Sequence, residues 1–307
     1  MQKNVVNIGT RSSRLAMWQA EEVRSALERN FARLKVNIVI RETLGDKVLD
    51  KALSKIGDKG LFTKEIEAGL EAGNLDVAVH SLKDLPTTLP NGLILGGVLT
   101  RGEVRDVFIS RDGRKLRNFM HEDRIGTSSL RRQAQLLHFN PELKIVDIRG
   151  NVESRLRKME EGHCEGVVLA GAGVERLGLK NRITEYLSPE IMLPAVSQGA
   201  VAMQIRDQDS EMAELIQSIS DPLDMQAVRI ERRFLKTVGG GCQVPVACYT
   251  EMSKNEIKIT GLIASVDGRI LLRKSVSCEP GKAIEQAEHL AKTLLEMGGR
   301  GILNTIR

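Results

Sequence analysis

Segments typical of β-strands and of α-helices alternate along the first two thirds of this 307-residue chain. One helix is marked by Ala16, Ala20, Val23 and Leu27, which recur at helical spacing and define one apolar face. Further helices are expected over 63–72, from 130, with Leu130, Ala134 and Leu137 facing inward, and from 152. Strand-like runs cover 5–9, 35–41, 76–80, 106–109, 124–127, 144–148 and 166–170. Strands that alternate with helices predict an α/β sheet architecture.

Two stretches interrupt this pattern, at 101–105 and at 193–199, and we interpret them as crossings between two α/β lobes with a hinged cleft. From about residue 222 the pattern changes to a helix, two strands joined by Asp267-Gly268, and a final helix over 283–297. This part predicts a small α+β domain. The expected domains are 1–99 with 200–218, then 100–199, then 219–307.

Composition narrows the class of protein. Hydrophobic residues make up 41% and charged residues 28%, and no apolar run reaches the length of a membrane span. No signal-peptide core precedes the first strand, so we expect a cytoplasmic protein without a membrane partner. Four cysteines show no Cys-x-x-Cys spacing and the five histidines no metal-ligand spacing, so neither a disulfide nor a metal site is expected.

The net charge of +5 raises the possibility of an anionic partner. One Trp, two Tyr and six Phe are too few to indicate a stacking surface for single-stranded nucleic acid. The charge therefore favours a smaller anionic ligand and no nucleic acid. A nucleic-acid-binding protein and a hinged anion-binding protein without catalysis remain as alternatives.

Three expected strand-to-helix turns combine hydroxyl or amide groups with arginine. They are 10–14, 127–132 and 149–151, the last with Arg155 one turn into its helix. Backbone N–H groups at a helix N-terminus bind anions, and arginine binds carboxylates with paired hydrogen bonds. Helix capping with solvated arginines is the alternative for any one turn. Arginine in a first helical turn opposes the helix dipole unless an anion is present, so the three together favour an anion site.

Lys83 and Asp84 directly follow a strand, at the end where open α/β sheets bind ligands. Asp84 is therefore a candidate catalytic carboxylate, although a surface ion pair is the alternative. The glycine-jointed, basic segment 54–64 is either a mobile lid or a solvated loop.

Cys242 lies in Gly239-Gly240-Gly241-Cys242-Gln243-Val244-Pro245, where glycines permit unusual backbone conformations and proline fixes one side of the turn. This loop suggests a presented thiol, although a small apolar cysteine in a tight turn is the alternative. No base partner for the thiol is identifiable in the sequence.

Together these motifs resemble the porphobilinogen deaminase family over nearly the whole chain. The most specific part is Glu231-Arg232-Arg233-Phe234 followed by 240–247. Supporting stretches are 9–13, 58–62, 80–84, 126–132, 149–151 and 194–199. The resemblance implies two similar lobes with mixed sheets, like those of periplasmic binding proteins, and a small C-terminal domain.

The resemblance also implies a monomeric transferase of tetrapyrrole biosynthesis. Such an enzyme joins four porphobilinogen molecules, with loss of ammonia, onto a dipyrromethane cofactor bonded to a cysteine, here Cys242, and releases hydroxymethylbilane by hydrolysis. Asp84 would be the catalytic group. Cofactor binding would fall to Cys242, Lys83, Asp84, Thr127, Ser128, Ser129, Arg131, Arg132 and Gly150. Substrate binding would fall to Arg11, Ser13, Gln19, Arg149, Arg155, Arg176 and Gln198. Lys55, Lys59 and Phe62 would belong to the lid.

Three positions depart from the family pattern. Ser197 occupies a position where glycine is usual, Asp58 replaces a frequent glycine, and 102–104 lacks an acidic-proline run. All three lie in expected hinge or lid segments, so we expect them to affect flexibility and turnover rate more than the chemistry.

Overall fold

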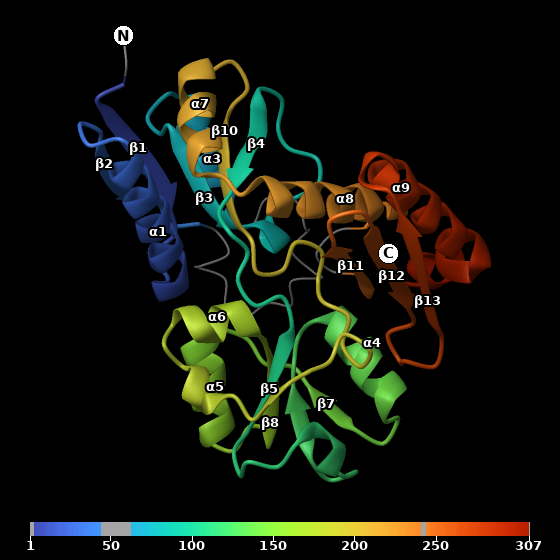
Figure 1. Ribbon diagram of the computed structural model, residues 1–307. Coiled ribbons are helices and arrows are strands. Elements are labelled where there is room, and N and C mark those ends of the chain that lie inside the picture. The colour runs from blue at the N-terminus through green and yellow to red at the C-terminus, as the bar shows by residue number, and fades with distance from the viewer. Residues whose placement is uncertain (1–2, 44–62, 241–243, 307) are drawn as a thin grey trace. The chain divides into compact units, whose positions relative to one another are not determined.

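The computed structural model describes residues 3–43, 63–240 and 244–306 and divides into two compact units (Figure 1). Unit 1 consists of Met1–Gly102 and Gly199–Gln226, and unit 2 of Glu103–Gln198 and Ala227–Arg307. The first two passages between the units fall within 101–105 and 193–199. The finer division into three domains stays a prediction.

Unit 1 contains a mixed five-stranded sheet of order β2-β1-β3-β10-β4. β1 is parallel to β2 and β3, whereas β10 is antiparallel to β3 and β4. The strands are β1 (Val5–Thr10), β2 (Lys35–Ile40), β3 (Val77–Ser81), β4 (Leu93–Val98) and β10 (Val201–Arg206). The helices are α1 (Arg14–Asn30), α3 (Lys64–Glu71) and α7 (Ser210–Ile219), with a 3₁₀ turn η2 (Leu82–Asp84) after β3.

The apolar face expected for the first helix forms part of the unit 1 core. Ala20, Val23 and Leu27 of α1 pack with Val6 and Ile8 of β1, and all five side chains are buried. The helical spacing of the apolar residues therefore determined both the helix and its buried side.

Unit 2 contains a second mixed five-stranded sheet, of order β7-β6-β8-β5-β9. β6 is parallel to β7 and β8, and β5 is antiparallel to β8 and β9. The strands are β5 (Asp106–Ser110), β6 (Arg124–Gly126), β7 (Lys144–Val146), β8 (Gly166–Ala170) and β9 (Glu185–Tyr186). The helices around this sheet are α4 (Leu130–Phe139), α5 (Val152–Glu160) and α6 (Gly171–Arg176). The arrangement repeats that of unit 1, with β6, β7, β8, β5 and β9 in the places of β1, β2, β3, β10 and β4. The prediction of two similar α/β lobes with mixed sheets is confirmed.

The buried side of α4 differs from the prediction. Ala134 is buried as expected, and Leu137 is partly buried against the core that contains Leu136, which is fully buried. Leu130 is only partly buried. Arg131 and Arg132 are also buried, because a carboxylate inside unit 2 pairs with them. Apolar periodicity cannot identify a helix face that is buried through ion pairs.

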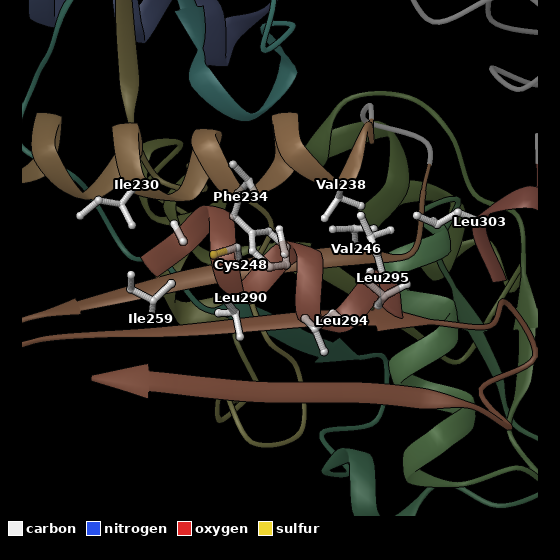
Figure 2. Close-up of a cluster of buried hydrophobic side chains, with 14 of the residues drawn as sticks. Ile230, Phe234, Val238, Val246, Cys248, Ile259, Leu290, Leu294, Leu295 and Leu303 are labelled. Carbon is white, nitrogen blue, oxygen red and sulfur yellow. The ribbon is translucent and has the colours of Figure 1, made fainter. Parts of the chain in front are cut away.

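The remainder of unit 2 is a three-stranded antiparallel sheet of order β11-β12-β13 with helices packed on it. Its elements are α8 (Pro222–Val238), which begins in unit 1, β11 (Val246–Met252), β12 (Ile257–Ala264), β13 (Leu271–Cys278), α9 (Ala283–Leu294) and α10 (Arg300–Asn304). Figure 2 shows Phe234 of α8, Val246 of β11 and Leu294 of α9 in one apolar core. A Cβ atom at Gly261 would lie 2.5 Å from Phe234 Cε2, so glycine is what allows this ring to approach the sheet. The expected small α+β domain is confirmed.

The predicted final helix over 283–297 is too long. α9 ends at Leu294, and a π-helical turn follows over Leu295–Gly299, in which Gly298 has a φ of 116°. This left-handed glycine interrupts the helix before α10 begins.

Candidate active site

Asp84 lies on a short turn whose backbone is fixed by buried leucines. η2 follows β3 directly, Leu82 N–H donates to Ala200 O at 3.0 Å, and Leu85 N–H donates to Leu82 O at 3.1 Å. Leu82 and Leu85 are buried, whereas Asp84 between them is exposed and Lys83 is half-buried. The turn therefore presents a carboxylate to solvent from a well-packed base at the C-terminal end of β3, as the sequence predicted.

The hydroxyl groups of the turn after β1 cap and brace α1, which is the alternative interpretation of this turn. Ser13 is the N-cap of α1, and its Oγ accepts a hydrogen bond from Ala16 N at 3.3 Å. Thr10 Oγ1 donates to Ala16 O at 3.2 Å. Arg11, between them, is half-buried. Burial is the main cause that lowers the pKa of His80 in β3, and the positive charge of Arg11 lowers it further. The end of β3 is thus within the electrostatic reach of the arginine in the first turn.

Gln19, expected to bind substrate, is buried inside unit 1. It is 2% exposed, and its Nε2 donates to Ser81 Oγ at 2.8 Å. In this structure Gln19 fixes the last residue of β3, immediately before the turn that carries Asp84. Direct contact between Gln19 and a substrate stays a prediction.

In unit 2, the turns after β6 and β7 are joined by a hydrogen bond. Ser128 Oγ donates to Ile148 O at 2.6 Å, and Thr127 Oγ1 accepts from Ser129 N at 3.2 Å. Ser129 is the N-cap of α4, but its side chain makes no capping hydrogen bond. The hydroxyl groups predicted to bind the cofactor therefore gather at one edge of the sheet, where two parallel strands end.

The turn after β7 combines a left-handed glycine with a capped helix N-terminus and two arginines. Gly150 has a φ of 110°, which favours glycine, and Asn151 caps α5 by accepting from Ser154 N at 2.8 Å. Arg155 Nε donates to Gly150 O at 2.8 Å, and Arg149 Nε lies 3.5 Å from Asp147 Oδ2. Two arginines are thus placed beside the N-terminus of one helix. Arg176, the last residue of α6, is also partly buried.

Arg131 and Arg132 are ion-paired inside unit 2. Arg131 Nη1 and Arg132 Nη2 each lie 2.8 Å from an oxygen of Asp106, which is fully buried. Gln198 Nε2 donates to the same carboxylate at 3.1 Å and to Val104 O at 2.8 Å. One carboxylate faces two guanidinium groups, so the cluster carries an excess positive charge.

Asp106 is the member of this cluster that the sequence analysis missed. Burial by itself raises the pKa of its carboxyl group, but Arg131 and Arg132 outweigh burial and hold the pKa well below its usual range. The available signal was an acid at the head of the otherwise apolar run 107–109. Such an acid indicates a buried ion pair.

The described flanks of the Cys242 loop are anchored, whereas Cys242 itself lies outside the described residues. Gly239, with a φ of 69°, ends α8, and Gly240 packs so closely that a Cβ atom would lie 2.9 Å from Leu235 and Val244 side chains. Beyond the loop, Pro245 O accepts from Ala264 N at 3.0 Å. The predicted lid residues Lys55, Lys59 and Phe62 also lie outside the described residues.

Glu231 of the most specific motif is a second group whose contacts the sequence analysis missed. Its side chain is completely buried, with Oε2 accepting from Ser197 N at 2.6 Å and Oε1 from Thr250 N at 3.1 Å. The carboxylate joins α8 to β11, the two elements on either side of the Cys242 loop, and to the segment at 197. These two hydrogen bonds explain why a glutamate is tolerated at the buried position 231.

Other classes of site are not found in the described ranges. No cluster of three His, Cys, Asp or Glu side chains suited to a metal ion occurs within 3–43, 63–240 and 244–306. In the same ranges no helix is both long and apolar enough to cross a membrane. Cys164 and Cys248 are buried free thiols, and burial raises the pKa of Cys164 to about 11.

Two family models together match most of this chain. A family model described as the dipyromethane cofactor binding domain of porphobilinogen deaminase matches residues 6–214, and the model of its C-terminal domain matches 225–297. These matches define an enzyme of the class that carries a dipyrromethane cofactor. The chain belongs to the porphobilinogen deaminase family.

Curated relatives match almost end to end. Porphobilinogen deaminase of Syntrophomonas wolfei is 49% identical, over 97% of each chain, and that of Syntrophotalea carbinolica is 48% identical, over 99% of this chain and 96% of the relative. Among solved structures, the methionine binding protein MetQ is 14% identical with a TM-score of 0.42, over 73% of this chain and 91% of that chain.

Proposed function

We propose that this chain is a hydroxymethylbilane synthase that adds four porphobilinogen molecules in turn, with loss of ammonia, and releases a linear tetrapyrrole by hydrolysis. The observation that carries the proposal is the family match over residues 6–214 and 225–297, which includes the model of a cofactor-binding domain. The proposed chemistry uses the exposed acid Asp84 of unit 1 and the arginine-bearing turns of unit 2.

Asp84 is the proposed catalytic residue. Loss of ammonia from porphobilinogen leaves a positively charged methylene carbon, and joining two rings releases a proton. A carboxylate oxygen of Asp84 stabilises the positive charge and accepts that proton. Its place on η2 suits the role, because the buried Leu82 and Leu85 fix the backbone while the carboxylate faces solvent.

The residues of unit 2 fit an anionic cofactor. Each ring of a dipyrromethane bears carboxylates, and when bound the group supplies the pyrrole carbon to which the first substrate unit is joined. Arg131, Arg132 and the hydroxyls of Thr127, Ser128 and Ser129 are assigned to its carboxylates, supported by the excess positive charge around Asp106. Lys83, Asp84, Gly150 and the attachment residue Cys242 complete the proposed cofactor set.

Binding of substrate rings is assigned to the remaining polar groups. Arg149 and Arg155 suit carboxylates because they stand beside the N-terminus of α5. The full proposed set is Arg11, Ser13, Gln19, Arg149, Arg155, Arg176 and Gln198.

Cys242 is the proposed attachment point of the cofactor, through a thioether. The experiment that tests this is denaturing intact-mass spectrometry of freshly purified active protein. We expect a mass above that of the polypeptide by one dipyrromethane, and the mass of the bare polypeptide in Cys242→Ser. Cys278→Ser is the matched control, because Cys278 is a half-buried free thiol and should leave the added mass in place. A bare polypeptide mass in active wild-type protein would contradict the assignment.

Replacing Asp84 by Asn tests the catalytic role. We expect the cofactor mass to be retained while turnover falls by about 10²–10⁴-fold, since an amide can neither accept the proton nor balance the charge. Asp207→Asn is the control, an exposed acid of unit 1 that should leave turnover unchanged. Near-normal product formation by Asp84→Asn would remove Asp84 from the mechanism.

The proposal also includes a monomer that acts in the cytoplasm and binds no nucleic acid. Sedimentation at several concentrations tests the oligomeric state. A DNA-binding titration in physiological salt tests the last point, and tight, sequence-dependent binding that porphobilinogen does not displace would contradict it.

A further inference from the structure

A chain of buried hydrogen bonds runs through unit 1 beside the end of β3. His80 Nε2 lies 3.1 Å from Gln204 Oε1, Gln204 Nε2 donates to Glu67 Oε1 at 3.0 Å, and Thr63 Oγ1 donates to Glu67 Oε2 at 3.1 Å. All four side chains are buried. The chain connects β3 and β10 with the N-terminus of α3, and none of its members has a role in the chemistry described above.

The network determines which nitrogen of His80 carries the proton. The Glu67 carboxylate accepts from the amide nitrogen of Gln204, so the amide oxygen of Gln204 must face His80. An amide oxygen only accepts, and His80 Nε2 is therefore the donor. Burial lowers the pKa of His80 to about 4, and the positive charge of Arg11 acts in the same direction, so the ring is neutral at pH 7.

The last two residues of β3 are held on opposite faces of the sheet. Successive side chains of a strand point to opposite faces. His80 is bonded to Gln204 of β10, and Ser81 is bonded to Gln19 of α1. The next residue, Leu82, donates its N–H to Ala200 O. The polypeptide backbone is thus held from both faces of the sheet directly before the turn that carries Asp84.

We propose that His80 is a positioning residue for Asp84, which holds the end of β3 through the Gln204–Glu67 hydrogen bonds and so fixes the direction of the η2 turn. The proposal rests on the catalytic role of Asp84 proposed above. An aliphatic residue at 80 would leave Gln204 Oε1 without its donor, and the buried amide could then reorient. A displacement of about 1 Å at a reacting group is enough to lower a rate by about 10²-fold.

The wild-type protein provides the first test, without any substitution. Two-dimensional ¹H–¹⁵N NMR of protein labelled at its five histidines distinguishes the two neutral tautomers and the doubly protonated ring. His80 is assigned by the loss of its signals in His80→Gln. We expect a neutral Nε2–H ring at pH 7. A neutral Nδ1–H ring or a doubly protonated ring would overturn the network on which the proposal depends.

Kinetic measurements on two variants provide the second test. Gln at position 80 can still place an N–H near Gln204, so His80→Gln should keep kcat within about threefold of wild type. His80→Leu cannot, and its kcat should fall at least tenfold, with KM for porphobilinogen within twofold and the cofactor mass unchanged. His289→Gln is the control, because His289 is exposed on α9. A kcat for His80→Leu equal to that of His80→Gln would overturn the proposal.

A substitution at Glu67 tests the network if His80→Leu does not fold. Glu67→Gln keeps the size of the side chain but lets its amide oppose the orientation of Gln204. We expect a lower kcat, with KM for porphobilinogen and the cofactor mass unchanged, because a reversed Gln204 amide no longer accepts from His80. A kcat equal to that of wild type would overturn the proposal.

The outcomes separate this proposal from the proposed function. Full activity of Asp84→Asn would remove the catalytic role while the His80 tautomer remained as derived. An inactive Asp84→Asn together with normal kcat in His80→Leu would leave the catalytic role intact and remove the positioning role.

Discussion

The two mixed sheets have the same strand order, but equivalent strands of the two sheets carry different buried polar groups. In unit 1 the antiparallel strand β10 carries Gln204, bonded to His80. In unit 2 the corresponding strand β5 carries Asp106, paired with Arg131 and Arg132. A common topology therefore leaves the chemistry of each lobe open. In unit 1 the neutral His80–Gln204 pair is bonded to the Glu67 carboxylate, whereas the cluster around Asp106 in unit 2 carries an excess of positive charge.

The segments that follow the equivalent strands β3 and β8 also differ. β3 of unit 1 leads into η2, where Asp84 is exposed. β8 of unit 2 leads into α6, whose first four residues, Gly171 to Val174, are buried. Only one of the two equivalent strand ends therefore presents an acid, and unit 2 supplies its polar groups from the turns after β6 and β7 instead.

The largest effect is expected on breaking the ion cluster of unit 2. Asp106→Asn leaves two buried guanidinium groups without their counter-charge, which costs about 3–5 kcal/mol for a buried pair. Urea unfolding followed by far-UV circular dichroism measures the loss. Asp112→Asn is the control, since this half-exposed acid pairs with Arg114 at the surface and should cost less than about 1 kcal/mol. Equal effects of the two substitutions would contradict the special role of Asp106.

The two lobes are expected to respond differently to acid. The pKa of His80 falls from 6.5 in the unfolded chain to about 4 in the fold, chiefly through burial. Between these values the unfolded chain binds the extra proton, so stability falls as pH falls, by about 3 kcal/mol in total. The pKa of Asp106 is lowered, so its contribution is fully present above the unfolded value near 4 and is lost only as the pH falls below that value.

Hydrogen exchange between pH 6.5 and pH 4, corrected for the intrinsic rate, measures this difference. Protection of β3 and β10 should decline with acid before that of β5 and β8. In His80→Gln, which has no ring to protonate, the decline in unit 1 should be smaller. Parallel loss of protection in both lobes, unchanged by the substitution, would contradict the assignment of the acid response to His80.

The smallest change in stability is expected at Ser197. Among the described residues, Ser197 is the one non-glycine residue with a positive φ, which is 62°. Its buried hydroxyl has no hydrogen-bond partner among the described residues. Ser197→Gly relieves the backbone and removes the hydroxyl, against the entropic cost of glycine, so we expect a gain of up to about 1 kcal/mol. Ser197→Ala is the matched control, because it removes only the hydroxyl. Thermal unfolding of both variants measures the difference, and a loss of stability in Ser197→Gly would show that the conformation is not strained.

The sequence predicted the order and type of the elements where local patterns are strong. The helix with Ala20, Val23 and Leu27 formed as expected, and Asp267-Gly268 joins two strands. Strands β4 and β10 were not predicted. β10 lies between β3 and β4 although it follows them by more than 100 residues, and such a pairing leaves no local signal.

The candidate site was predicted by residue type, and the structure added the contacts. The turn at Asp84 lies where expected, but Gln19, Arg131 and Arg132 are buried and bonded within their own units. Asp106, Gln204 and Glu67 were not identified, because a polar residue inside an apolar segment acquires its meaning only from a partner distant in sequence. Their assigned roles toward cofactor and substrate stay predictions.

By itself the sequence determined the fold class, the family and the acid that follows β3, because apolar periodicity, turn residues and motif spacing are local properties of the chain. Only the tertiary structure decided which polar groups are buried together. Desolvation and pairing depend on neighbours brought in by the fold, and they make His80 a neutral donor in one lobe and Asp106 a paired anion in the other.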